Sequence, residues 1–282
     1  MQLFLLTALT MTAFAANSLL NRVGVATFGM DPLVFAVLRV VAGAVTLAVL
    51  VRLRGQNPFA NLSSHMRGAA ALAVYMVGFS WAYLTLGAGL GALILFGLLQ
   101  IMLFGWAVVQ GQVIPRMRWI GACCALLGLG VLLWPSDAVS VPFAGTVSMI
   151  LATAGWAAYT VLGQGARDPL AVSAGNFILC IPMVMLGLLA ASGGAITFGG
   201  VASAIVAGAV TSGLGYALWY RVLPNLPTTI AAVAQLSVPV IAVLGGAALL
   251  GEVITQRMVI AGCLVLGGIA LSNARAVPKR HS

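Results

Sequence analysis

Residues 169–220 read PLAVSAGNFILCIPMVMLGLLAASGGAITFGGVASAIVAGAVTSGLGYALWY, and this stretch contains no charged side chain. A second uncharged stretch covers residues 68–115. Transfer of a charge into hydrocarbon is costly, and a helix needs about 20 apolar residues to cross roughly 30 Å of hydrocarbon. Each stretch is therefore long enough for two crossings. We predict an all-α integral membrane protein.

The composition also favours a membrane protein. Hydrophobic residues make up 62% of the chain and charged residues 6%, whereas a typical soluble domain is about 45–50% apolar. Basic loops explain the formal net charge of +9, so we expect no nucleic-acid partner. The cysteines lie in apolar runs without metal-ligand or disulfide spacing, and we expect neither a metal nor another cofactor. They are Cys123, Cys124, Cys180 and Cys263.

Apolar runs and the breaks between them predict the membrane-spanning helices. Asp31-Pro32 and Asp168-Pro169 each place a turn-forming residue and a proline at a helix start. Residues 12–16 resemble a signal-peptidase site, but the apolar run continues past them, so we expect a retained first helix. The ten predicted transmembrane helices are 3–26, 32–53, 67–87, 90–110, 116–134, 142–164, 169–191, 198–221, 226–250 and 257–274.

An even number of crossings places both termini on the same side of the membrane. If that side is the cytoplasm, only Arg22, Arg39 and Arg257 of the 13 basic residues lie elsewhere, in agreement with the positive-inside bias. We therefore predict a multi-pass protein of the cell inner membrane with both termini cytoplasmic. We expect a monomer whose partners are the lipid bilayer and a small-molecule substrate.

The two halves of the chain repeat short motifs in the same order. The motif DPL at 31–33 recurs at 168–170, and GQVI at 111–114 recurs as GEVI at 251–254. The nearly constant offset indicates a duplication. Because each copy holds five helices, the second copy enters the membrane from the opposite face, and the substrate site of such inverted repeats lies between them. The predicted repeats are 1–137 and 138–282.

The duplication, the Gly251-Glu252 pair and the glycine-rich final span resemble the drug/metabolite transporter superfamily, in its EamA-type branch, over essentially the whole chain. Within that superfamily the chain is most similar to the YddG-like aromatic amino acid exporters. The resemblance implies a central cavity surrounded by helices 1–4 and 6–9, with helices 5 and 10 packed outside them. It also implies export of small metabolites. One departure is Gln112, where many relatives carry glutamate.

The residues themselves favour close packing of the fifth and tenth helices. Small side chains at helical spacing allow two backbones to approach closely in lipid. Such residues lie at corresponding positions of the two helices: Gly121, Ala125 and Gly128 on the fifth, and Ala261, Val265 and Gly268 on the tenth.

Polar residues inside the predicted spans are candidates for substrate binding, because hydrocarbon makes them costly. Asn17, near the middle of the first helix, would either contact substrate or hold two helices together, and Gln100 on the fourth helix would add a polar contact. Pro239 removes the backbone hydrogen bond to the carbonyl of Gln235 and exposes a polar point there. Pro182 interrupts the seventh helix in the same way. We predict both prolines as hinges, with a purely structural kink as the alternative.

Aromatic residues recur at helical spacing on the third and sixth helices. Tyr75, Phe79 and Tyr83 follow one another every four residues, and Trp156 and Tyr159 are three apart. Deep aromatic rings either pack in the core or line a cavity that binds an apolar or aromatic solute. We predict that these five residues line a substrate cavity.

Arg39 lies about seven residues into the second predicted helix, roughly 10 Å from its start. We favour the interpretation that its side chain snorkels to the outer surface. If it faces the cavity instead, it is a possible partner for the carboxylate of an anionic or zwitterionic solute.

The acidic residues Asp31, Asp137, Asp168 and Glu252 all fall at helix ends or in loops. Proton-coupled exchange of organic cations needs a carboxylate inside the membrane, so we predict a facilitative exporter of aromatic or other bulky apolar amino acids that works by alternating access. The alternatives are an exporter of other metabolites or lipophilic drugs coupled to an ion gradient, and a membrane scaffold without transport. We expect no enzyme, because no histidine or acidic side chain lies within a span.

Overall fold

The computed structural model describes residues 1–60, 62–112, 114–134, 142–164, 166–191, 193–222, 225–226 and 234–273. Within these residues the regular elements are helices, which confirms the predicted all-α class. The elements are α1 (Gln2–Arg22), η1 (Val23–Thr27), α2 (Pro32–Leu53), η2 (Leu62–His65), α3 (Met66–Ala82), α4 (Ala88–Val109), α5 (Arg116–Leu133), α6 (Phe143–Leu162), α7 (Pro169–Gly187), η3 (Leu188–Ala190), α8 (Phe198–Val206), η4 (Ala207–Leu214), α9 (Gly215–Val222), α11 (Ser237–Leu250) and α12 (Gln256–Asn273).

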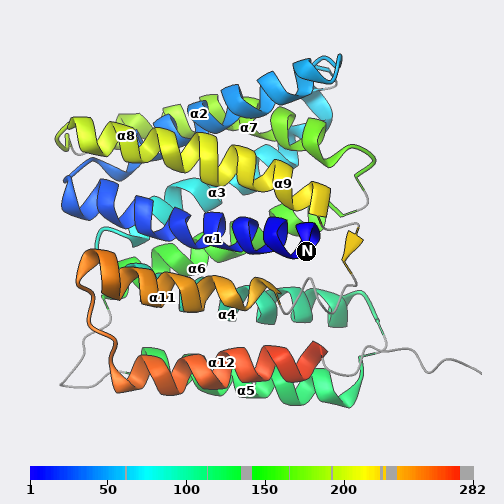
Figure 1. Ribbon diagram of the computed structural model, residues 1–282, viewed down its shortest axis with the longest axis vertical. Coiled ribbons are helices and arrows are strands. Elements are labelled where there is room, and N and C mark those ends of the chain that lie inside the picture. The colour runs from blue at the N-terminus through cyan, green and yellow to red at the C-terminus, as the bar shows by residue number, and fades with distance from the viewer. Residues whose placement is uncertain are drawn as a thin grey trace, which may run out of the picture.

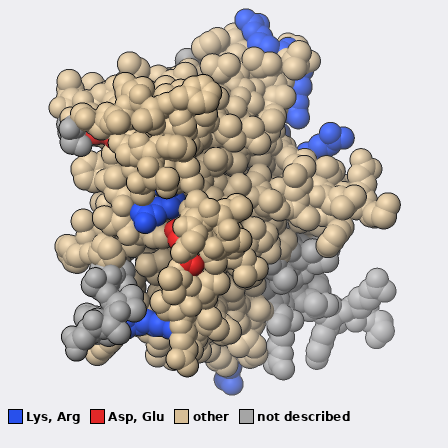
Figure 2. Space-filling view, turned by 60° about the vertical axis from the view of Figure 1, so that its left-hand side comes forward, with Lys and Arg blue, Asp and Glu red and all other residues tan. Residues whose placement is uncertain are grey.

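The chain is a multi-pass membrane protein. Seven helical stretches of the described residues are long and apolar enough to cross a membrane, and two further apolar helices, α11 and α12, are shorter. Large apolar side chains such as Phe4, Leu127 and Leu189 are exposed on the outside, where lipid would cover them. Figure 2 shows one face of the molecule, on which Lys, Arg, Asp and Glu occupy only scattered points.

The two predicted Asp-Pro helix starts are confirmed. Asp31 precedes α2, and its carboxylate accepts hydrogen bonds from the backbone N–H of Leu33 at 2.8 Å and of Val34 at 3.4 Å. Asp168 precedes α7 and accepts from the N–H of Ala171 at 3.1 Å. A side-chain oxygen in this position satisfies an N–H that the helix itself cannot pair, and proline in the first turn loses no bond.

The helices lie side by side with their axes roughly parallel, and α5 and α12 form a pair at one edge of the bundle (Figure 1). Elsewhere α3 packs on α6, α2 on α7, and α4 on both α6 and α11. α1 contacts α11 and the continuous stretch formed by α8, η4 and α9. The buried core therefore brings together elements from both halves of the sequence.

The close approach predicted for the fifth and tenth helices is confirmed in the contact between α5 and α12. A Cβ added at Gly268 would lie 2.5 Å from the backbone oxygen of Gly121, and one added at Gly128 would lie 2.9 Å from that of Ala261. Neither backbone leaves room for a side chain. Glycine at these positions is therefore what allows the pair to form.

Among the described residues two segments are π-helical, and the sequence analysis predicted neither. η1 follows α1 directly, and η4 lies between α8 and α9. At η4 the backbone passes so close to α2 that a Cβ on Gly208 would lie 2.1 Å from the carbonyl oxygen of Arg39. Single π-helical turns inside a longer helix occur frequently at functional sites, and η4 faces the cavity described next.

Candidate functional site

A small cavity lies among α1, α3, α4, α6 and the η4–α9 stretch, with Gln235 on one side. Its volume is about 40 Å³, which is room for about three water molecules. The lining includes several residues predicted from the sequence, namely Asn17, Tyr75, Phe79, Trp156 and Gln235. The other lining residues are Phe14, Ser18, Ala92, Leu95, Phe96, Thr211 and Tyr216.

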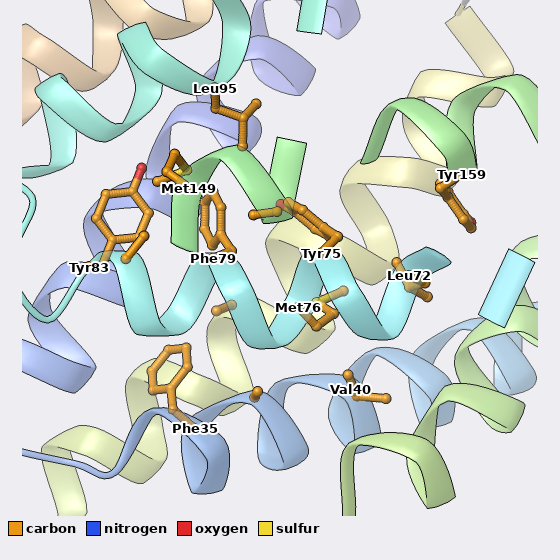
Figure 3. Packing of buried hydrophobic residues seen from close by; sticks show 14 of the residues in the cluster. Phe35, Val40, Leu72, Tyr75, Met76, Phe79, Tyr83, Leu95, Met149 and Tyr159 are labelled. Atoms are coloured by element: carbon orange, nitrogen blue, oxygen red, sulfur yellow. The ribbon is translucent and has the colours of Figure 1, made fainter. Parts of the chain in front are cut away.

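Three of the predicted aromatic residues form a row on α3. Figure 3 shows Tyr75, Phe79 and Tyr83 rising from one face of the helix, opposite the side on which Phe35 of α2 packs. Neighbouring ring centroids are 5.1 Å apart for Tyr75 and Phe79 and 4.7 Å apart for Phe79 and Tyr83. Tyr83 is fully buried and does not line the cavity. The row therefore runs from the cavity into the core.

Trp156 of α6 forms the aromatic wall opposite this row. Its ring lies 4.9 Å from that of Tyr75, 5.4 Å from that of Tyr216 and 5.5 Å from that of Tyr159, on which it stacks. Phe14 of α1 meets Tyr216 edge to face at 5.9 Å. Rings arranged in this way offer flat apolar surfaces to a solute.

Asn17 connects three elements through its side-chain amide. The amide nitrogen donates to the hydroxyl of Tyr75 at 3.4 Å, and the amide oxygen accepts from the hydroxyl of Thr211 at 3.1 Å. Asn21 donates to the backbone oxygen of Asn17 at 2.9 Å and accepts from Ser80 at 3.1 Å. Buried polar groups that satisfy one another define a single arrangement of the helices around them.

Arg39 is buried, with 0% of its surface exposed, so the favoured interpretation of a snorkelling side chain is wrong. Its Nε donates to the hydroxyl of Ser212 at 3.2 Å and its Nη2 to that of Tyr75 at 3.3 Å. The guanidinium carbon lies 5.1 Å from the centre of the Phe79 ring. Within the described residues Nη1 has no hydrogen-bond partner and the side chain forms no salt bridge. A buried cation without a counter-ion is unfavourable.

The π-helix η4 supplies Thr211 and Ser212, which the sequence analysis missed. Their hydroxyls contact Asn17 and Arg39 respectively, and both side chains are buried. In an α-helix, consecutive side chains point about 100° apart, so a widened turn changes which polar groups face inward. Small polar residues among glycines at 208, 213 and 215 are the only sequence signal, and such a pattern is also common at simple helix contacts.

The remaining predicted residues lie outside the cavity lining. Tyr159 is buried and its hydroxyl lies 3.2 Å from that of Ser173 on α7. Gln100 lies on α4 beyond the lining residue Phe96, and Pro182 lies inside α7 with an exposed side chain.

Pro239 lies in the first turn of α11 rather than at the centre of a longer continuous helix. Residues 234–235 are helical, Leu236 forms a turn, and α11 follows. The break falls beside Gln235, whose carbonyl the proline leaves without its helical partner. Residues 227–233, within the predicted ninth helix, and the predicted repeat boundary at 137–138 lie outside the described residues.

A second feature joins the two halves of the chain at one end of the bundle, and we call it the Glu252 junction. The Glu252 carboxylate accepts from the N–H of Ala88 at 2.7 Å and of Gly89 at 3.3 Å, at the start of α4. Arg22 approaches the same carboxylate at 3.7 Å and donates to the backbone oxygen of Tyr83 at 3.0 Å. An anion at a helix N-terminus is stabilised by the unpaired N–H groups and by the helix dipole.

The comparisons with known proteins place the chain in a family. The EamA-like transporter family matches residues 143–274. An uncharacterized protein of Pseudomonas aeruginosa is 47% identical over 268 residues, which is 95% of this chain and 93% of that protein. The chain belongs to the EamA-like transporter family. This EamA-like protein is therefore a membrane transporter. The apolar helices and the resemblance to the EamA-type branch both predicted this.

More distant relatives agree with this assignment. An uncharacterized transporter of Archaeoglobus fulgidus is 25% identical over 85% of this chain and 88% of its own. An uncharacterized transporter of Bacillus subtilis is 25% identical over 86% of this chain and 84% of its own. A crystal structure superposes on the EamA-like protein with a TM-score of 0.70 over 96% of each chain at 17% identity, a likeness that shows the fold alone.

Proposed function

We propose that this EamA-like protein exports aromatic or other bulky apolar amino acids across the cytoplasmic membrane by facilitated alternating access. The observation that carries the proposal is the combination of an aromatic cavity wall with a buried cation directly behind it. Trp156, Tyr75 and Tyr216 offer ring surfaces to an apolar side chain. Arg39, which has no salt bridge within the described residues, is the group that a carboxylate would pair with.

We also propose ten spans arranged as two inverted repeats, and the helix contacts support this arrangement. In the proposed repeats α1 corresponds to α6, α2 to α7, α3 to the α8–η4–α9 stretch, α4 to α11 and α5 to α12. Exchanging each element with its counterpart maps the contact of α3 with α6 onto that of α1 with the α8–η4–α9 stretch. It maps the contact of α4 with α6 onto that of α1 with α11. The pairs α2–α7, α4–α11 and α5–α12 map onto themselves, as a two-fold axis between the halves requires.

Matched local structure gives further support for duplication. Gly111 and Gly251, which follow α4 and α11, have φ angles of 66° and 65°. Gly55 and Gly193, which follow α2 and the α7–η3 stretch, have φ angles of 75° and 80°. Left-handed glycines at helix ends are common, but their occurrence at corresponding positions in the same order favours a common origin.

The cavity is too small for an amino acid in the described conformation, so binding requires the halves to move. Its 40 Å³ compares with about 300–1,000 Å³ for pockets that hold small molecules. Rocking of one repeat against the other around a fixed site would supply this expansion. Facilitated transport is favoured because the described acidic residues Asp31, Asp168 and Glu252 all cap helix starts instead of facing the cavity.

Counterflow in liposomes tests the function. Purified protein preloaded with unlabelled phenylalanine should accumulate labelled phenylalanine, tryptophan and leucine. It should exclude lysine, whose side-chain cation would have to lose its water against the apolar cavity wall. Collapsing a proton gradient should leave the rates unchanged. Absence of counterflow for all the apolar amino acids would contradict the substrate class, and rates that follow the proton gradient would contradict facilitated transport.

A further inference from the structure

We propose that the hydroxyl of Tyr75 occupies the position that a carboxylate of the solute takes on Arg39 and Asn17, so that Tyr75 is displaced when solute binds. This inference rests on the proposed function and deepens it. It makes Arg39 the anion-recognition residue and Tyr75 a residue that competes with the solute for the same donors.

The first argument is the hydrogen bonding around a single oxygen. The Tyr75 hydroxyl oxygen accepts from Nη2 of Arg39 at 3.3 Å and from the amide nitrogen of Asn17 at 3.4 Å. Both distances are longer than the roughly 2.7–3.2 Å that is usual for an N–H···O hydrogen bond. A carboxylate oxygen carries negative charge and would accept from the same two donors more strongly than a neutral hydroxyl does.

The second argument is the unsatisfied part of Arg39. A guanidinium has N–H donors arranged in a planar fork that matches a carboxylate. Nη2 is partly satisfied by Tyr75, whereas Nη1 has no partner within the described residues although the side chain is fully buried. A carboxylate bound to both Nη atoms would satisfy Nη1 and neutralise the buried charge in one step.

The third argument is the position of the Tyr75 ring. The ring lines the cavity, while its hydroxyl points to Arg39, which is not among the lining residues. Tyr75 therefore stands between the cavity and the guanidinium. Its displacement would open the path to Arg39 and enlarge a cavity of about 40 Å³, so recognition of the anion and expansion of the site would be a single event.

The chemistry limits the class of solute. One cation and one amide suit a single carboxylate on an apolar or aromatic body, whereas a phosphate dianion would require a second buried cation. The described residues that line the cavity include no lysine or arginine, so Arg39, which contacts the lining residue Tyr75, is the cation available to a solute. The inference thus predicts recognition of the carboxylate itself, in addition to the aromatic side chain.

The test compares ligands that differ only in that group. Thermal unfolding of the purified protein is measured with phenylacetate and with phenylacetamide, and counterflow with phenylalanine and with phenylalaninamide. Phenylacetate should raise the Tm more than phenylacetamide does. Phenylalanine should be transported with at least about tenfold preference over phenylalaninamide, as expected for loss of a hydrogen bond to a charged group. Equal response to acid and amide would overturn the inference while leaving transport of apolar amino acids intact.

Three variants complete the experiment. Tyr75→Phe keeps the ring and removes the competing hydroxyl, so the KM for phenylalanine should fall by about threefold or more while that for the amide stays the same. Arg39→Gln should abolish the preference for the acid and the Tm response to phenylacetate. Tyr159→Phe is the matched control, because its hydroxyl contacts Ser173 instead of Arg39, and it should change neither ratio.

The stability of Arg39→Gln separates a binding role from a structural one. Since this variant removes a buried, unpaired cation, its Tm without ligand should equal or exceed that of the wild type. A large loss of Tm, or a Tyr75→Phe variant that weakens acid and amide equally, would show that Arg39 and Tyr75 only pack the core. Failure of wild-type transport with an intact phenylacetate response would contradict the proposed function alone.

Discussion

Trp156 and Asn17 line the cavity with different chemistry, one an aromatic ring and the other a polar amide. Trp156 contacts the rings of Tyr75, Tyr159 and Tyr216, whereas Asn17 presents an amide between Tyr75 and Thr211. A solute with an apolar body and a polar head would need both surfaces. The wall and the amide come from α6 and α1, in different halves of the chain.

We therefore expect Trp156→Ala and Asn17→Ala each to reduce phenylalanine counterflow by about tenfold, because one loses ring contacts and the other a buried hydrogen-bond partner. Membrane insertion should be unaffected. The matched controls are Trp119→Ala, an exposed ring on α5, and Asn176→Ala, a buried amide on α7 that does not line the cavity. If the controls fall as far as the site variants, the cavity has no special role.

At the scale of helices, the contact between α5 and α12 depends on absent side chains. Gly268 lies where any Cβ would strike the backbone of α5, whereas Gly267, one residue earlier, has nothing within 4 Å of its Cβ position. Two neighbouring glycines on the same helix thus have opposite surroundings. The difference arises because the two residues lie on different faces of α12, and the face with Gly268 contacts α5.

Gly268→Ala should destabilise the protein by about 1–3 kcal/mol, since an added methyl in a packed contact forces the backbones apart. Gly267→Ala should be neutral or slightly stabilising, because alanine favours the helix over glycine. Thermal unfolding in detergent measures both. Equal Tm values for the two variants would mean that the close contact of α5 and α12 does not exist in the protein.

At the scale of the whole molecule, the cavity must become accessible to water from each side in turn. In a variant whose native cysteines are replaced, Ala92→Cys, which lines the cavity, should react with a water-soluble maleimide added to either face of the membrane, and phenylalanine should slow the reaction. Ala125→Cys, buried on α5, is the control and should not react. A cysteine at 92 that is unreactive from both faces would contradict alternating access.

The sequence was sufficient for features that depend on neighbouring residues. Asp31 and Asp168 predict helix starts because their side chains hydrogen-bond to backbone groups nearby in the sequence. Uncharged runs predict membrane helices because they are long enough to cross the membrane. The small residues of α5 and α12 predicted the contact between these helices, because small side chains on one helix face let two backbones approach closely in lipid.

The candidate site was only partly predictable, because it depends on how helices rotate against one another. Distance along one helix suggested that Arg39 would reach the surface, yet α3 and η4 surround it with Tyr75 and Ser212. Tyr159 and Trp156 are three residues apart, but only Trp156 reaches the cavity. The widened turn that brings in Thr211 has no distinct sequence pattern.

The Glu252 junction makes the rims of the bundle chemically unequal. At one end a carboxylate holds the start of α4 and approaches Arg22, while Gln112, at the corresponding position of the other half, is exposed and neutral. In the proposed cycle, opening the Glu252 end separates a charged group from its helix, and opening the opposite end involves no such group at Gln112. Efflux and influx would then have different maximal rates even though the solute contacts the same cavity lining. The difference would originate at the Glu252 junction.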